Sequence, residues 1–163
     1  MNFLRKIEKF GSNICFIDEN KKKIIYKNIL RKSEKLSEGL EPRSLIFVLA
    51  ENHTEFFTSY IGFFRKELVQ MLLDSKISTS LFKELIKIYM PNYIFMPNSR
   101  INDLKNYEIF RQLDNHVILK LNKDNSYSIN KDLILLLSTS GSTGSKKFVR
   151  ISHENIYHNT KDI

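Results

Sequence analysis

The stretch of this sequence whose residue types are best suited to chemistry is Ser138–Lys147, which reads STSGSTGSKK. It combines six hydroxyl side chains, two glycines and two lysines, and it contains no carboxylate. Each hydroxyl can donate a hydrogen bond, and glycines let main-chain N–H groups approach a ligand closely. Such a row of donors suits an anion with several oxygens, so we predict a polyphosphate-binding loop with Lys147 as a point charge at its far end.

Two common nucleotide-binding patterns do not fit this loop. A Walker loop needs a second glycine five residues after the first and a hydroxyl two residues later, but Lys146 and Phe148 stand at these positions. The Rossmann pattern G-x-G-x-x-G is absent. A flexible surface turn rich in Ser and Gly is the alternative. We disfavour it because the loop leaves the apolar run 133–137 and enters the strand-like run 148–151.

The segments around the loop predict an α/β fold with a mainly parallel sheet flanked by helices, because strand-like and helix-like patterns alternate from Ser44 to Met96. Strands are predicted as apolar runs, and helices as segments with apolar residues on one face. In chain order we predict a short amphipathic helix at 1–10, a hairpin at 15–26, a helix at 26–39, and strands at 44–50, 68–74, 93–96, 117–121 and 131–139, with helices at 51–66 and 78–89.

The local signals differ in strength between these elements. In the helix 51–66, Asn52 is the predicted N-cap and Glu55 completes a capping box. Its aromatic stripe is interpreted as packed core rather than as a ligand groove, and it consists of Phe56, Phe57, Tyr60, Phe63 and Phe64. The pattern of the segment Ile101–Leu113 fits either a helix or an irregular loop.

A helix is also predicted after the loop, with Ser152 as its cap and His153 as its first residue. The motif HENIYH resembles a zinc motif, but His153 and His158 are five residues apart, which is about 140° around a helix. We therefore predict no metal ligands.

Composition narrows the class of protein. The 163 residues suffice for one domain, and 42% hydrophobic residues exclude a disordered chain. No apolar run approaches the roughly 18 residues of a membrane helix, and no signal-peptide pattern is present, so a cytoplasmic location and no membrane partner are expected. Cys15 is the only cysteine and is predicted to be a buried thiol in a strand.

The net charge of +8 is compatible with nucleic acid, an anionic membrane or a phosphate-rich ligand. The lysines are scattered, and the only dense run is Asn20–Lys23, at an expected turn. Because no arginine stripe interleaved with aromatics occurs, nucleic-acid binding is the less favoured reading.

The residues from Thr139 to Val149, followed by Ser152 and His153, resemble the phosphate-binding signature of the adenylate-forming ligase superfamily. This superfamily includes acyl-CoA synthetases, adenylation domains of peptide synthetases and firefly luciferase. Its usual signature is T-S-G-[ST]-T-G-x-P-K-G-V, with Ser-His shortly after. Lys146 and Phe148 depart from it, since Pro and Gly are usual there, but neither departure removes a donor. The matching positions are Thr139, Ser140, Gly141, Ser142, Thr143, Gly144, Lys147, Val149, Ser152 and His153.

The resemblance covers nearly the whole chain and implies that residues 1–163 are a partial N-terminal AMP-binding domain, the first part of the family's large domain. On this resemblance, the rest of that domain and the small C-terminal domain are expected to lie outside these residues. It leaves open whether the chain is truncated, is the first piece of a split enzyme or is a partial sequence. It also leaves open whether the chain folds alone and what its oligomeric state is.

The resemblance further implies an AMP-forming ligase that activates a carboxylic acid as an acyl-adenylate. ATP is the expected cofactor, with Mg²⁺ in the complete enzyme, and the loop including Lys147 holds the β- and γ-phosphates. No catalytic residue can be assigned, and neither the acid nor the acceptor can be named. The 163 residues alone are expected to form no acyl-adenylate, and a complementing chain could carry the rest of the enzyme. The alternatives are a non-catalytic nucleotide- or phosphate-binding module and, less favoured, a basic nucleic-acid-binding protein.

Overall fold

The structure is a computed structural model, and it describes residues 3–18, 21–121, 128–138 and 147–161. No described helix has the length and apolar character needed to cross a membrane. In chain order, with η for a 3₁₀-helix, the elements are η1 (Phe3–Phe10), β1 (Ile14–Ile17), β2 (Lys23–Ile25), α1 (Tyr26–Ser37), β3 (Leu45–Ala50), α2 (Thr54–Arg65), β4 (Val69–Asp74), α3 (Thr79–Tyr89), β5 (Tyr93–Pro97), η2 (Asn98–Asp103), β6 (Glu108–Gln112), β7 (His116–Lys120), β8 (Leu133–Ser138), β9 (Phe148–Ser152) and α4 (His153–Lys161).

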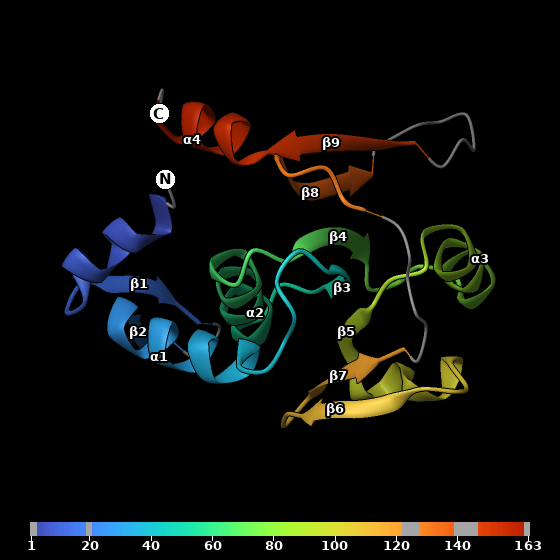
Figure 1. The fold of residues 1–163 in the computed structure, drawn as a ribbon. Coiled ribbons are helices and arrows are strands. Elements are labelled where there is room, and N and C mark those ends of the chain that lie inside the picture. The colour runs from blue at the N-terminus through green and yellow to red at the C-terminus, as the bar shows by residue number, and fades with distance from the viewer. Residues whose placement is uncertain (1–2, 19–20, 122–127, 139–146, 162–163) are drawn as a thin grey trace.

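A seven-stranded sheet forms the centre of the molecule, in the order β6-β7-β5-β3-β4-β8-β9 (Figure 1). β3 pairs in parallel with β4 and β5, and β4 pairs in parallel with β8. The outer pairs β5–β7, β6–β7 and β8–β9 are antiparallel. The predicted α/β class with a mainly parallel sheet flanked by helices is therefore confirmed. Because the four central strands run in one direction, their carboxyl ends share one edge of the sheet, and these ends are Ala50, Asp74, Pro97 and Ser138.

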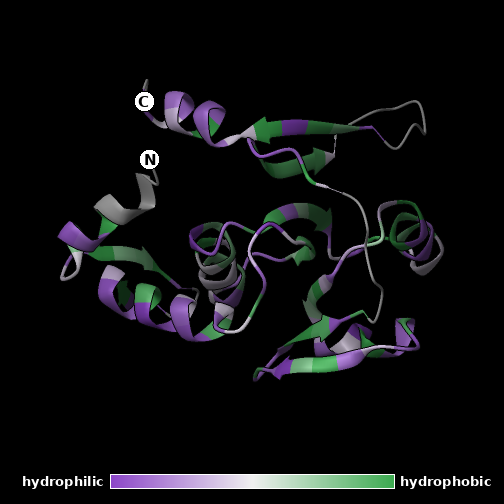
Figure 2. Cartoon of the chain, viewed as in Figure 1, coloured by the Kyte–Doolittle hydropathy of each residue, from purple (hydrophilic) through white to green (hydrophobic). Residues whose placement is uncertain are grey.

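Helices cover both faces of this sheet. On one face, α1 and α2 pack a cluster around Phe63 against Val48 of β3. On the other face, Phe82 of α3 packs on Phe47 of the same strand, with ring centroids 6.4 Å apart. Figure 2 shows the expected contrast, with β8 hydrophobic along its length and α4 mostly hydrophilic. Alternate residues of β3 thus face opposite helical layers, as a strand buried on both faces requires.

α1 and α2 approach each other closely because small residues lie between them. Ser33 and Ser37 of α1 are buried, and so are Thr58, Ser59 and Gly62 of α2. The serine hydroxyls donate to carbonyls of their own helix, for example Ser37 Oγ to the Ser33 oxygen at 2.9 Å, so their burial leaves no donor unpaired. A Cβ added to Gly62 would lie 2.6 Å from the Ser33 carbonyl oxygen, so this position accepts only glycine at the present helix separation.

The predicted start of α2 is wrong. The helix begins at Thr54, and its N-cap is His53, which makes no side-chain capping hydrogen bond, so Asn52 does not cap it. The predicted aromatic stripe is wrong at Phe57, which is 43% exposed. Phe57 instead packs on Phe16 of β1, with ring centroids 5.6 Å apart, because the β1–β2 hairpin lies beside this side of α2.

The segment 101–113 differs from the prediction in its second half, where β6 pairs with β7 as an edge strand. A register shift between Ile109 and Arg111 interrupts the alternation that would have indicated a strand. The expected amphipathic helix at the N-terminus is the 3₁₀-helix η1. Cys15 lies in β1 as predicted, but it is only half-buried, because the β1–β2 hairpin is a separate small sheet.

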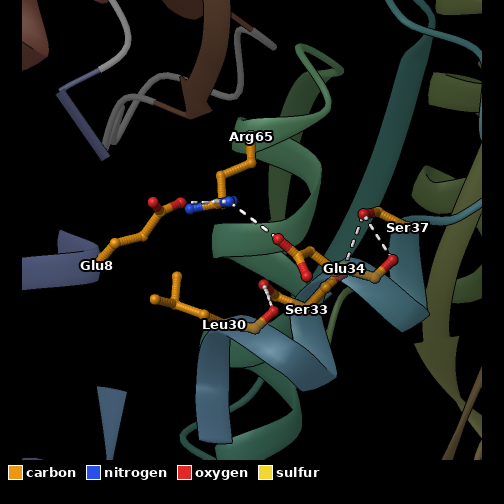
Figure 3. Close-up of polar contacts among 6 residues, drawn as sticks. All are labelled: Glu8, Leu30, Ser33, Glu34, Ser37 and Arg65. Atoms are coloured by element: carbon orange, nitrogen blue, oxygen red, sulfur yellow. Dashed lines mark hydrogen bonds and ion pairs between the residues drawn. The ribbon is translucent and has the colours of Figure 1, made fainter. Parts of the chain in front are cut away.

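Arg65, at the end of α2, joins three elements of the N-terminal half (Figure 3). Its Nη2 lies 3.0 Å from a carboxylate oxygen of Glu8 in η1 and 3.0 Å from one of Glu34 in α1. The Arg65 side chain is 17% exposed, whereas both glutamates are largely exposed. The guanidinium therefore ties η1 to the α1–α2 pair.

Replacing Arg65 by alanine should lower the free energy of unfolding by only about 1 kcal/mol, because ion pairs with exposed partners are screened by water. The same change should accelerate amide hydrogen exchange in η1, which loses its tether. Arg65→Met keeps the apolar stem and should restore most of the unfolding free energy without slowing that exchange. Urea unfolding and hydrogen exchange measure the two effects, and unchanged exchange in η1 would show that Glu8 is not held through Arg65.

Candidate functional site

The two ends of the predicted loop meet at the carboxyl edge of the sheet. β8 and β9 form an antiparallel pair in which Ser138, the last residue of β8, lies opposite Phe148, the first residue of β9. Lys147 directly precedes β9 and is exposed. The other predicted site residues lie outside the described residues, and they are Thr139, Ser140, Gly141, Ser142, Thr143 and Gly144.

Buried and packed side chains of β8 and β9 hold Ser138 and Phe148 in place. In β8, Ile134 is fully buried and Leu135 and Leu136 are nearly so. At the start of β9, the ring of Phe148 packs edge-on against Tyr89 of α3, with centroids 5.5 Å apart. Because β8 is also bonded in parallel to β4, the segment between Ser138 and Phe148 begins and ends on fixed backbone.

The neighbouring turns at this edge are held by side chains. Arg100 in η2 donates from Nη1 to the Ser75 carbonyl at 2.6 Å, directly after β4. Its Nε donates to Asp103 Oδ2 at 2.7 Å, and Asp103 Oδ1 accepts from Thr79 of α3 at 3.0 Å. The ends of β4 and β5 are therefore connected to each other beside the place where β8 ends.

His116, at the start of β7, is a buried titratable group at the same edge. It is 2% exposed, stacks on Phe95 at 4.9 Å, and lies 3.4 Å from Glu51, beyond the usual hydrogen-bond length. Neither ring nitrogen has a hydrogen-bond partner among the described residues. Burial lowers the pKa of His116, and the nearby carboxylates of Glu51 and Glu55 only partly oppose this shift.

Acidification should destabilise the protein through this histidine. As the pH falls, a histidine whose pKa is lower in the folded state becomes protonated first in the unfolded state. The free energy of unfolding therefore begins to fall near the unfolded pKa of about 6.5, and it stops falling below the folded pKa. His153, whose pKa burial also lowers, contributes in the same direction. Urea unfolding between pH 7.5 and 5 should therefore show a shallower loss for His116→Gln than for the wild type. His158→Gln, on the exposed side of α4, is the control, and equal slopes for His116→Gln and the wild type would contradict the prediction.

The predicted cap of α4 is confirmed. The Asn155 amide donates to Ser152 Oγ at 3.1 Å, and Asn155 Oδ1 accepts in return from the Ser152 amide at 3.0 Å. His153 packs edge-on against Phe64 of α2 at 5.0 Å, whereas His158 is exposed and lies 3.6 Å from Glu154. Over the described ranges, no group of three or more His, Cys, Asp or Glu side chains could hold a metal ion.

A cleft of about 700 Å³ lies away from the loop, at the amino ends of β3 and β4. Leu45 and Val69, the first residues of these strands, line it together with Met90 from the end of α3 and Leu133 from the start of β8. The sequence does not predict this cleft, because no local pattern shows how a helix is placed on a sheet. Ligands of open parallel sheets bind at the carboxyl edge, so the cleft is not the predicted phosphate site.

Comparison with known proteins identifies the family to which the chain belongs. The family model described as AMP-binding enzyme matches residues 3–163. Enniatin synthase from Fusarium equiseti is 26% identical over 153 residues, which are 88% of this chain and 5% of that protein.

Two solved structures share the fold over 98% of the chain. Apo MatB from Rhodopseudomonas palustris aligns with a TM-score of 0.75 at 15% identity, and this chain covers 36% of it. The O-succinylbenzoate coenzyme A synthetase MenE from Bacillus subtilis aligns with a TM-score of 0.74 at 16% identity, and this chain covers 44% of it. The chain therefore spans less than half the length of these relatives. The family model, matched over almost every residue, shows that the chain belongs to the AMP-binding enzyme family.

Proposed function

We propose that this chain is the nucleotide-phosphate-binding part of an enzyme that uses ATP to convert a carboxylic acid into an acyl-adenylate. Residues 1–163 correspond in this proposal to a partial N-terminal AMP-binding domain. The observation that carries it is the placement of Ser138 and Phe148 side by side at the carboxyl edge of a parallel sheet, with a donor-rich sequence between them.

The chain's own residues serve to bind and orient the nucleotide. In this proposal, hydroxyl and amide groups from the sequence between Ser138 and Lys147 donate hydrogen bonds to the β- and γ-phosphates, and the Lys147 ammonium offsets their negative charge. The α-phosphate then stays accessible to a carboxylate oxygen, which attacks phosphorus while pyrophosphate leaves. This is catalysis by positioning and by charge stabilisation, and it needs no proton transfer from this part of the enzyme.

The family's solved members support this use of the fold. MatB from Rhodopseudomonas palustris has been solved with ATP bound, and MenE from Bacillus subtilis with AMP and with the acyl-adenylate intermediate OSB-AMP. Magnesium is expected in complete enzymes, although the described residues include no group of three or more His, Cys, Asp or Glu side chains that could hold a metal ion. The remainder of the site would come from further polypeptide, as a continuation or as a separate complementing chain.

Calorimetric titration with ATP tests the proposal. The purified chain should bind ATP at one saturable site and should show no acid-dependent exchange between ATP and pyrophosphate. Absence of saturable binding would refute the phosphate-binding role. Exchange catalysed by the homogeneous chain would refute the proposal that further polypeptide is required.

A further inference from the structure

The cleft at the amino ends of β3 and β4 combines apolar side chains with polar ones. Its floor on the sheet consists of the buried residues Leu45, Val69 and Leu136, and one wall consists of Ile88 of α3 and the helix C-cap Met90. Ile88 is 54% exposed, although it is a large apolar side chain. Tyr89 of α3 packs on Phe148 of β9, and the cleft lies between the end of α3 and the β8–β9 pair. A ligand that covers Ile88 and Met90 would therefore remove apolar surface from water.

One cationic side chain, that of Arg150, lines the same cleft. Arg150 of β9 lies directly opposite Leu136 of β8, so both side chains point to the same face of the sheet. Arg150 lines the cleft and is exposed, and it has no hydrogen bond or ion pair in the described part of the chain. Asp132 also lines the cleft, on the segment that leads into β8. Its carboxylate repels anions, so an anionic group is expected to bind on the Arg150 side.

We propose that this cleft binds an organic anion with an apolar body. The carboxylate or sulfonate contacts the Arg150 guanidinium, and the apolar body lies against the exposed side chains of Ile88 and Met90. A volume of about 700 Å³ lies within the range of small-molecule sites, which combine apolar walls with a few polar groups that fix orientation. A guanidinium suits this role because its planar donors match a carboxylate in pairs. The site is separate from the phosphate loop and does not depend on the proposed function.

Titration calorimetry with octanoate tests this site in the full chain. Arg150→Gln should weaken octanoate binding by about tenfold, the loss expected for one charge-assisted contact. Ile88→Ser should weaken it several-fold by removing an apolar wall. Arg31→Gln, which removes an exposed arginine of α1, and Ile109→Ser, which removes a half-exposed isoleucine of β6, are the matched controls and should bind octanoate like the wild type. ATP affinity should be the same in all four variants.

Three results would overturn the proposal. The first is octanoate binding that Arg150→Gln and Ile88→Ser leave unchanged. The second is binding that the two controls weaken equally, which would indicate adsorption of the anion to the basic surface. The third is a dimer in size-exclusion chromatography that Ile88→Ser dissociates and that shows no octanoate binding, because the cleft would then be occupied by a second copy of the chain. Loss of ATP binding in Lys147→Ala with octanoate binding intact would support two separate sites.

Discussion

Replacing Lys147 by alanine should weaken ATP binding to this chain by about tenfold or more, since a charge-assisted contact contributes about 1.5–3 kcal/mol. Lys147 is the last residue before β9, and Phe148 fixes its position by pairing with Ser138 and packing on Tyr89. The backbone of Lys147 is therefore anchored at the end of the loop. Calorimetric titration of the variant with ATP measures the effect.

The controls for this prediction separate a local contact from general electrostatics. Lys83→Ala removes an exposed lysine of α3 and the same net charge, and it should leave ATP affinity unchanged. Lys147→Arg keeps the charge and should retain most of the affinity. Equal losses in Lys83→Ala and Lys147→Ala would mean that the net charge of +8, and not a built site, attracts the nucleotide.

Gly62→Ala should lower the free energy of unfolding by about 2 kcal/mol, within the range for overpacked interiors. This sign is opposite to the usual one, because alanine in place of glycine inside a helix normally gains about 1 kcal/mol. The reason is the 2.6 Å approach of the new Cβ to the Ser33 carbonyl oxygen, which belongs to backbone and cannot rotate away. α1 and α2 must therefore separate, and apolar contacts around Phe63 loosen with them.

Gly11→Ala is the matched control for this variant. A Cβ at Gly11 would meet its nearest atom, the Glu8 carbonyl oxygen, at 3.5 Å, which is ordinary contact. Urea unfolding of the two variants should therefore show a large loss for Gly62→Ala and little change for Gly11→Ala. If Gly62→Ala were as stable as the wild type, the close α1–α2 contact would not exist in solution.

The sequence predicted the sheet well because its central strands are determined by local apolar runs. β3 and β8 are continuous hydrophobic segments, and such segments occur in strands that helices cover on both faces. α4 was located by its Ser152 cap, whose hydrogen bonds with Asn155 are local as well. In these elements, residues a few positions apart determine the structure, so their pattern is readable without knowledge of the fold.

The remaining features depend on contacts between segments that are distant in sequence. His53 replaces Asn52 at the start of α2, because a side-chain cap contributes only about 1 kcal/mol and packing of α2 outweighs it. Phe57 lies outside the main core because its ring packs on Phe16 of the β1–β2 hairpin. The apolar cleft near Ile88 results from the position of α3 relative to β9, which no local pattern encodes.

Amide hydrogen exchange of the purified chain, with and without saturating ATP, tests the phosphate-binding role most directly. We expect ATP to slow exchange in peptides that span residues 136–150 and to leave α3 and β6 unchanged. Slower exchange confined to other segments, with the same rates as before from Ser138 to Lys147, would contradict the assignment of this loop to the phosphates of ATP.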